Sequence, residues 1–298
     1  MNTTHMHIPS NRVRDIERYF LSELEGLYPP EELHTFVYML FEAFLGWDKT
    51  HFLLHRDETI NQSDLLRFHW AAEDLKQFRP IQHIIGYTDF CNTRIKVSPH
   101  VLIPRPETEE IVNHILGIPA FSPHAILDLC TGSGCIAIAL KKHFPQASVV
   151  GVDLSDNALA QARDNATLNN AAVTFIQMDI LNQRQLSSLT QTFDLIISNP
   201  PYVMQNERDE MRPNVLDHEP PQALFAPDDN PMLFYRAIAT YASAHLSKDG
   251  LLVTEINEHH GEILKSLYSS AGLQPTLYKD FRGKDRYIIA QSLQSHQS

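Results

Sequence analysis

Cysteine is scarce in this sequence, and its spacing matches no familiar scaffold. Cys91, Cys130 and Cys135 are the three cysteines among 298 residues, and no two of them form a Cys-x-x-Cys pair. The sixteen histidines include no His-Glu-x-x-His segment. Disulfide frameworks and zinc sites depend on such patterns. We therefore expect neither a disulfide scaffold nor a metal site, and we expect a reducing, cytoplasmic environment.

Long apolar segments are also missing. No window holds the roughly 18 or more consecutive apolar residues that a membrane-spanning helix needs. The first fifteen residues, MNTTHMHIPSNRVRD, contain no apolar signal region. We therefore expect no membrane partner and no secretion. Hydrophobic residues nevertheless make up 43% of the chain, which is enough for a sizeable core and excludes wholesale disorder.

Positive charge is in deficit. Lys and Arg number 24 against 36 Asp and Glu, so the formal net charge is −12. Proteins that bind duplex DNA without sequence preference usually present a basic face, so duplex nucleic acid is not the expected partner. The length suits one large domain or two smaller ones, at roughly 150 residues per domain. The sequence does not reveal the oligomeric state, for which a monomer is the working expectation.

The first part of the chain has the apolar pattern of helices. Ile16, Phe20 and Leu24 share one helical face, and similar spacing predicts a second helix that ends near Gly46 and a third helix after it. No strand pattern appears in this region. The sequence therefore predicts a small, all-helical domain over residues 1–85.

A different pattern follows in residues 86–106. Apolar residues are separated by polar ones, and Cys91-Asn92-Thr93 looks like a turn. This alternation predicts a β-hairpin that links two domains.

Strand and helix patterns alternate over residues 107–298. Such alternation predicts an α/β domain with a doubly wound, mainly parallel sheet of seven strands. In such sheets, ligands bind at the carboxyl ends of the strands where the strand order reverses. The predicted strands are 125–129, 148–153, 172–178, 193–198, 251–255, 275–279 and 285–291, and the predicted helices are 108–116, 134–143, 156–169, 231–246 and 258–271.

A glycine-rich turn and two strand ends form a candidate cofactor site. Glycine lets the backbone turn tightly and lets a ligand approach without a Cβ in the way. An acid at the end of the second strand can accept hydrogen bonds from both hydroxyls of a ribose. The end of the third strand lies where an adenine would bind. The residues of this site are Asp128, Cys130, Thr131, Gly132, Ser133 and Gly134 in the turn, Asp153 after the second strand, and Asp179 and Ile180 after the third.

The glycines alone leave the cofactor open. Gly132-x-Gly134-x-x-Ala137 also satisfies the pattern of a dinucleotide-binding loop. Asp128 favours S-adenosylmethionine over NAD, because a carboxylate suits a cationic sulfonium or ammonium better than a pyrophosphate. Asp179 adds a third acid at a strand end. A tight turn without any ligand, and an NAD-dependent oxidoreductase, remain the alternatives.

The run Asn199-Pro200-Pro201-Tyr202 directly follows the fourth predicted strand. Its prolines fix φ and lack N–H donors. The Pro200 carbonyl and the Asn199 side-chain oxygen would then form a pair of acceptors for one NH₂ group, in a planar amide or an exocyclic amine. Tyr202 can stack on that planar group. The alternative is a rigid turn after a strand, with Tyr202 in the core.

These motifs together resemble a known family. DLCTGSG, GVDLS and SNPPYV resemble class I S-adenosylmethionine-dependent methyltransferases that act on amino groups. Further runs, RPIQHIIG, LIPRPETEE, HEP and GKDR, narrow the resemblance to the release factor glutamine methyltransferases, the PrmC/HemK family. The similarity covers nearly the whole chain from about residue 79. Cys130 departs from the glycine of many members, and a sister family that methylates a ribosomal-protein glutamine often has cysteine there.

The resemblance implies a Rossmann-like methyltransferase domain with S-adenosylmethionine as cofactor. It implies methyl transfer to the side-chain amide nitrogen of the glutamine in the Gly-Gly-Gln motif of class I peptide chain release factors. The Asn-Pro-Pro-Tyr run would hold that amide, with Asn199 touching both ligands. Methylation of a ribosomal-protein glutamine, or of adenine N6 in nucleic acid, is the alternative activity.

Three charged residues and the helical domain complete the expected site. Arg105 and Glu107 would close it from the linker, or else brace the seam between the domains. Glu219 would border the substrate, or else be a solvated loop charge. The helical domain is expected to recognise the protein substrate, because the second domain already accounts for the cofactor and the amide.

Overall fold

The structure is a computed structural model that describes residues 10–292. Most of the segment examined for a signal peptide, and the last six residues, therefore lie outside the described part. The chain divides into two compact units. The helical unit comprises Met1–Gly86 and Pro213–His218, and the sheet unit comprises Tyr87–Arg212 and Glu219–Ser298.

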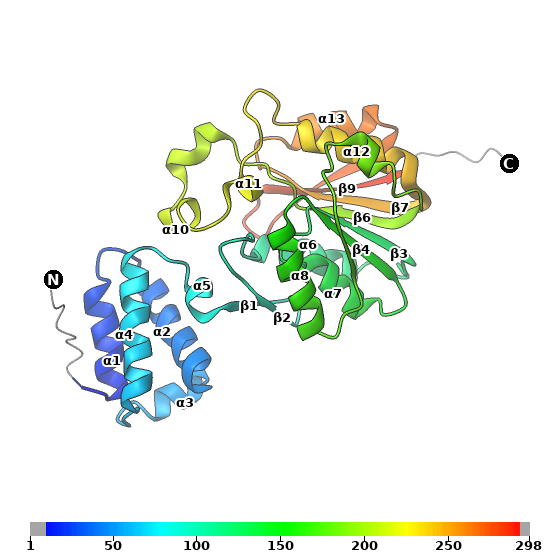
Figure 1. Cartoon of the computed structure of the whole chain (residues 1–298). Coiled ribbons are helices and arrows are strands. Elements are labelled where there is room, and N and C mark those ends of the chain that lie inside the picture. Colours follow the sequence, from blue (N-terminus) through cyan, green and yellow to red (C-terminus); the bar gives the residue numbers. More distant parts are fainter. Residues whose placement is uncertain (1–9, 293–298) are drawn as a thin grey trace. The chain divides into compact units, whose positions relative to one another are not determined.

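The helical unit packs the five helices of its first stretch around one apolar core. Ile16, Phe20 and Leu24, which were predicted to share a helical face, are all buried in that core. The second helix ends at Gly46, whose φ of 69° suits glycine at a helix end. Its helices are α1 (Val13–Glu23), α2 (Pro30–Leu45), α3 (Lys49–Leu54), α4 (Gln62–Lys76), α5 (Ile81–Ile85) and α10 (Pro213–Leu216) (Figure 1).

Half of these helices escaped the sequence prediction. Helices α3, α5 and α10 contain six, five and four residues, and such short segments show no helical period. The sequence also placed residues 213–218 in the second domain, whereas the structure groups them with the helical unit. There, the imidazole Nε2 of His218 lies 2.9 Å from the carbonyl oxygen of Gln77.

Within the described residues, seven strands of the sheet unit form a single sheet in the order β5-β4-β3-β6-β7-β9-β8. Neighbouring strands are parallel from β5 to β7, and β9 is antiparallel to both of its neighbours. The predicted doubly wound, mainly parallel sheet is thus confirmed. The strands are β3 (Ala125–Leu129), β4 (Ser148–Asp153), β5 (Thr174–Gln177), β6 (Phe193–Ser198), β7 (Leu246–Glu255), β8 (Leu273–Lys279) and β9 (Asp285–Ser292).

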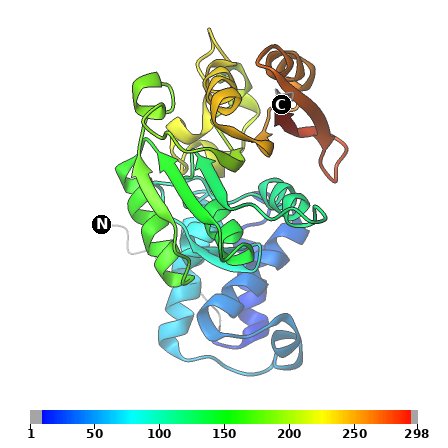
Figure 2. The same ribbon diagram turned by 90° about the vertical axis from the view of Figure 1, so that its right-hand side faces the viewer.

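Helices cover both faces of this sheet (Figures 1 and 2). Successive strand residues point to opposite faces, so each strand contributes to two cores. Ile126 and Leu195 pack on the side of α6 and α7, whereas Leu127 and Ile196 pack on the side of α12 and α13. The helices are α6 (Pro106–Leu116), α7 (Cys135–His143) and α8 (Asp156–Leu168) on one face, and α12 (Leu233–His245) and α13 (Gly261–Ser270) on the other.

The hairpin predicted over residues 86–106 is confirmed only in its first half. Strands β1 (Tyr87–Phe90) and β2 (Thr93–Lys96) pair through a two-residue turn. Cys91 and Asn92 have φ of 45° and 59°, and this positive φ at both positions matches the twist of paired strands.

Residues 97–105 form no strand, so the second half of that prediction is wrong. Pro99 and Pro104 cannot donate to a strand ladder. The Ile103 N–H donates instead to the carboxylate of Glu219 at 2.9 Å. Val101 and Ile103 are nevertheless buried, which explains why their pattern resembled that of a strand.

Strand β7 begins five residues before its predicted start. Phe193 pairs with Leu246, and the register then shifts so that Leu195 pairs with Leu251. The polar residues between Leu246 and Leu251 concealed this bulged segment from a reading based on apolar runs.

The connections between strands hold further short helices, α9 (Gln183–Leu186), η1 (Gln205–Glu210) and α11 (Pro221–Leu224). None was predicted, because four to six residues show no period. Over residues 10–292, no helix is both long enough and apolar enough to cross a membrane.

Gly151 in β4 offers a test of the packing beneath the glycine-rich turn. A Cβ at this position would lie 2.8 Å from the Phe175 ring and 3.0 Å from Thr131 Oγ1. We expect Gly151→Ala to lower the unfolding free energy by about 1–3 kcal/mol, because extra volume in a packed site forces neighbours to move. Differential scanning calorimetry measures the change. Gly117→Ala is the control, since its Cβ would meet neighbours at 3.4 and 3.5 Å; an equal loss there would contradict the packing argument.

Candidate functional site

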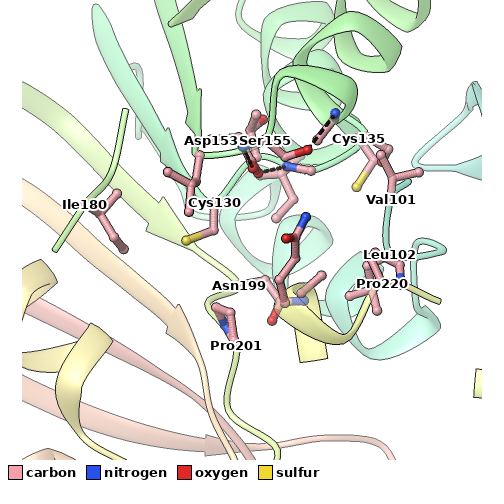
Figure 3. Close-up of a pocket in the computed structure, with 18 of the residues that line it drawn as sticks. Val101, Leu102, Cys130, Cys135, Asp153, Ser155, Ile180, Asn199, Pro201 and Pro220 are labelled. Carbon is pink, nitrogen blue, oxygen red and sulfur yellow. Dashed lines mark hydrogen bonds between the residues drawn. The ribbon is translucent and has the colours of Figure 1, made fainter. Parts of the chain in front are cut away.

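A cavity opens at the carboxyl ends of β3, β4, β5 and β6, beside the reversal of strand order between β3 and β6 (Figure 3). The loops after all four strands contribute to its wall, as do the segment before α6 and the segment around α11. Sequence reasoning predicted this location from topology alone. The lining includes Leu102, Arg105, Thr108, Cys130, Thr131, Gly132, Ser133, Asp153, Leu154, Met178, Asp179, Ile180, Asn199, Pro201, Pro220, Gln222 and Phe234.

The glycine-rich turn uses its two glycines differently. Gly132 has φ of 54° and no atom within 4 Å of a built Cβ, so its backbone is open to a ligand. Gly134 is the cap that precedes α7, with φ of 79°, and a Cβ there would lie 3.1 Å from Ala162 Cβ. Gly134 therefore permits close helix packing and does not line the cavity. Cys130 also has a positive φ, 61°, a conformation that glycine adopts without strain.

Asp153 fastens two loops of the cavity to each other (Figure 3). Its Oδ2 accepts from Gly132 N–H at 2.9 Å, and its Oδ1 accepts from Ser155 N–H at 2.9 Å. Burial raises the pKa of Asp153, and these backbone N–H groups oppose the rise. Each carboxylate oxygen has a further lone pair, so both remain able to accept from ribose hydroxyls.

Asp128 lies deeper than the sequence suggested. Its side chain is fully buried, and it is not part of the cavity wall. The Thr131 hydroxyl donates to its Oδ2 at 2.6 Å. Burial raises the pKa of Asp128 to about 7. The carboxyl group thus braces the turn from behind, and its contact with a cofactor stays a prediction.

The wall of the cavity fits S-adenosylmethionine. Asp153 and Asp179 supply carboxylates near the strand ends, and Ile180 lies among apolar neighbours suited to the face of an adenine. Among the described residues that line the cavity, Arg105 is the one arginine and no lysine occurs. The carboxylates of Asp153 and Asp179 would repel a pyrophosphate placed beside them. The donor set therefore suits a cationic nucleoside better than NAD.

The Asn-Pro-Pro-Tyr run is divided between the cavity and the core. Asn199 and Pro201 line the cavity, whereas Pro200 is buried and Tyr202 packs against the core cluster. The Tyr202 hydroxyl donates to Glu255 Oε1 at 2.9 Å. Stacking of the Tyr202 ring on a substrate amide remains a prediction.

Arg105 and Glu219 form an ion pair within the sheet unit. The Arg105 guanidinium lies 2.6 Å from Glu219 Oε1, and the side chain of Glu219 is 1% exposed. Its other oxygen accepts from the Ile103 N–H. Glu219 therefore fastens the segment before α11 to the segment before α6, and its contact with a substrate stays a prediction. Glu107 lies 3.8 Å from Arg282 and does not line the cavity.

Sequence reasoning missed two residues next to Asn199. Thr108, in the first turn of α6, lines the cavity and donates to Glu255 Oε2 at 2.6 Å. Glu255 ends β7 and is 2% exposed. A signal was present in the sequence, because an acidic residue lies at the carboxyl end of this predicted strand, where ligands of such sheets bind.

Comparison with known proteins gives matches to both parts of the chain. A model of the PrmC N-terminal domain matches residues 18–86, and one of the methyltransferase small domain matches residues 111–224. A methyltransferase crystal structure from Pyrococcus furiosus shares the fold, with a TM-score of 0.50 and 19% identity over 67% of this chain and 88% of that one.

Two relatives resemble the chain over almost its full length. The release factor glutamine methyltransferase of Flavobacterium psychrophilum is 41% identical, over 93% of this chain and 98% of its own. That of Bacteroides thetaiotaomicron is 38% identical, over 92% and 98%. The chain therefore belongs to the release factor glutamine methyltransferase family.

Proposed function

We propose that this enzyme transfers a methyl group from S-adenosylmethionine to the side-chain amide nitrogen of the glutamine in the Gly-Gly-Gln motif of class I release factors. The observation that carries the proposal is the position of Asn199, which lines the same cavity as the glycine-rich turn and Asp153. Family membership supports a protein glutamine as the substrate. We further propose that the enzyme acts as a monomer in the cytoplasm, where release factors work.

The chemistry needs alignment more than a strong base. S-adenosylmethionine, when bound, supplies a methyl group already activated by its sulfonium. An amide nitrogen is a weak nucleophile, because its lone pair is delocalised into the carbonyl. The Asn199 oxygen and the Pro200 carbonyl would accept its two protons, return electron density to nitrogen and fix its direction. Such alignment can lower a barrier by about 7–11 kcal/mol in favourable cases.

Methyl transfer forms one bond, breaks one bond and releases one proton. The nitrogen–carbon bond forms as the carbon–sulfur bond breaks, and the sulfur keeps the electron pair. The nitrogen then loses one proton to solvent. This order requires no general base before methyl transfer.

Asp153 is the test of the cofactor site. Asp153→Ala removes the acceptor for two ribose hydroxyls, and charge-assisted hydrogen bonds contribute about 1.5–3 kcal/mol each. We expect the dissociation constant for S-adenosylmethionine to rise at least tenfold, by about 1.4 kcal/mol or more, in isothermal titration calorimetry. Asp156→Ala, at the exposed start of α8, is the matched control. Unchanged affinity for Asp153→Ala would remove the residue from the ribose site.

Asn199 is the test of the proposed reaction. Mass spectrometry of class I release factors, after incubation with enzyme and S-adenosylmethionine, should show one added methyl group on the glutamine of the Gly-Gly-Gln motif. We expect Asn199→Ala to lower kcat by about 10²–10³, since one well-placed polar contact at a reacting centre is worth that much. Circular dichroism should show an intact fold.

The same experiment separates the alternatives. Asn199→Asp should also be inactive. It keeps an acceptor of similar size, but its negative charge beside the cationic cofactor would misplace the substrate amide. Methylation of a ribosomal protein or of DNA adenine, with release factors left unmodified, would replace the proposed substrate. A kcat for Asn199→Ala within about threefold of wild type would reject the amide clamp.

We also propose that the helical unit recognises the protein substrate. Its surface supports this role, because Trp70 is 63% exposed and lies one turn after Leu66, which is 40% exposed. Exposed tryptophans are common anchors of protein interfaces. Deleting residues 1–85 is a poor test, because residues 213–218 pack with the helical unit and would lose their partners.

Trp70→Ala tests this role in the full-length chain. We expect KM for the release factor to rise about fivefold or more, since anchor residues contribute over about 1 kcal/mol. The affinity for S-adenosylmethionine should not change. Leu54→Ala, at a residue of the same unit that is 75% exposed, is the control. An unchanged KM for Trp70→Ala would exclude this surface of α4.

A further inference from the structure

A chain of hydrogen bonds runs from Asn199 into the interior of the sheet unit. Asn199 Nδ2 donates to Thr108 Oγ1 at 3.2 Å, and the Thr108 hydroxyl donates to Glu255 Oε2 at 2.6 Å. The other oxygen of Glu255 accepts from the Tyr202 hydroxyl. Thr108 and Glu255 are both buried. The chain thus connects the proposed reacting centre to a carboxyl group away from solvent.

The number of available protons determines which group donates and which accepts in each of these hydrogen bonds. A carboxylate has no proton to donate, and a hydroxyl has one. The proton of Thr108 points to Glu255, so its oxygen is left to accept from Asn199. Only the NH₂ of the Asn199 amide can donate, so the amide oxygen must lie on the opposite side. Within residues 10–292, no group donates to Asn199 Oδ1, which leaves it available to a ligand.

We propose that Glu255, acting through Thr108, holds the Asn199 amide with its oxygen toward the substrate, and that both are positioning residues for methyl transfer. The inference rests on the proposed function, in which Asn199 Oδ1 accepts a proton from the glutamine amide. A reversed Asn199 would present its NH₂ to the NH₂ of the glutamine, and two donors form no hydrogen bond. The ionised state of one buried carboxyl group therefore decides whether the clamp can hold its substrate.

Several charges determine the pH at which Glu255 is ionised. Burial raises the pKa of Glu255, while hydrogen bonds from two hydroxyl groups and the positive charge of Arg286 oppose the rise. Arg286 is itself held by Asp280 at 3.0 Å. The titratable and charged groups that face Glu255 are Tyr202 after β6, Glu107 on α6, Arg286 on β9 with Asp280 behind it, and Tyr235 of α12, whose hydroxyl donates to the Glu255 backbone carbonyl at 3.1 Å.

Protonation of Glu255 allows the hydrogen bonds of this chain to run in the opposite direction. A carboxylic acid can donate to Thr108, which can then donate to Asn199 Oδ1 and turn the amide around. Because the pKa of Glu255 is raised, ionised Glu255 is present above that pKa and is lost as the pH falls through it. We therefore expect an acidic limb in the pH profile of kcat that belongs to this residue.

Two substitutions, at Glu255 and Thr108, would leave the direction of the hydrogen bonds from Asn199 to Glu255 undetermined. Two others serve as controls. Glu255→Gln keeps the shape but can either donate to or accept from Thr108. Thr108→Val removes the hydroxyl, whereas Thr108→Ser retains it. Thr254→Val makes the same change at the preceding residue of β7, which is fully buried and whose hydroxyl lies 2.9 Å from the Tyr268 hydroxyl, on another element.

The experiment measures kcat and KM on the release factor, the pH profile of kcat, cofactor affinity by calorimetry, and folding by circular dichroism. We expect Glu255→Gln and Thr108→Val to lower kcat about 10- to 100-fold, because small misplacements of a reacting group have effects of this size. KM and cofactor affinity should change less than about threefold. Thr108→Ser should recover most of the activity, and Glu255→Gln should lack the acidic limb.

Other results would overturn the inference. A kcat within about threefold of wild type for both Glu255→Gln and Thr108→Val would show that the amide needs no such support. An equal loss in Thr254→Val would show that any buried hydroxyl has the same effect. Persistence of the acidic limb in Glu255→Gln would assign it to another group. If the wild-type enzyme methylates no release factor, the proposed function fails and this inference fails with it. If the wild type and the variants are all active, the inference alone fails.

Discussion

Strands β3 and β6 are neighbours in the sheet, and the strand order reverses between them. The chain therefore leaves these two strands toward opposite faces, and a crevice opens at their carboxyl ends. The glycine-rich turn follows β3, and Asn199 follows β6 directly. The proposed methyl donor and methyl acceptor sites adjoin because of this arrangement. Cys130 and Asn199 line one cavity because each directly follows one of these two neighbouring strands.

Three carboxylates, of which Glu219 and Glu255 are buried, fasten the segments around that cavity. Asp153 joins the glycine-rich turn to the start of α8, and Glu219 joins the segment before α11 to the segment before α6. Glu255 joins the start of α6 to the Asn-Pro-Pro-Tyr run. Each of the three accepts from two donors, so each holds two contacts at once. The cavity is therefore organised before any ligand arrives, which lowers the cost of aligning the reactants.

The sequence predicted the parts of this structure that depend on local pattern. Strands β3, β4 and β6 have the predicted bounds, because buried parallel strands are short apolar runs with clear ends. The cavity residues Gly132, Asp153 and Asn199 could be predicted from strand ends and topology. The contacts of Glu219 with Ile103 and of Glu255 with Thr108 could not, because each joins residues over 100 positions apart in the chain. Hydrogen bonds of that range leave no periodic trace in a sequence.

The grouping of residues 213–218 with the helical unit has a consequence for the history and engineering of this chain. The backbone passes between the two units at residues 86–87, 212–213 and 218–219, so the helical unit is assembled from two separate stretches. A domain of this kind cannot be exchanged by a single crossover near residue 86. A chimera with a new substrate preference would have to inherit both stretches from the same parent, and recombination between distant relatives would separate them.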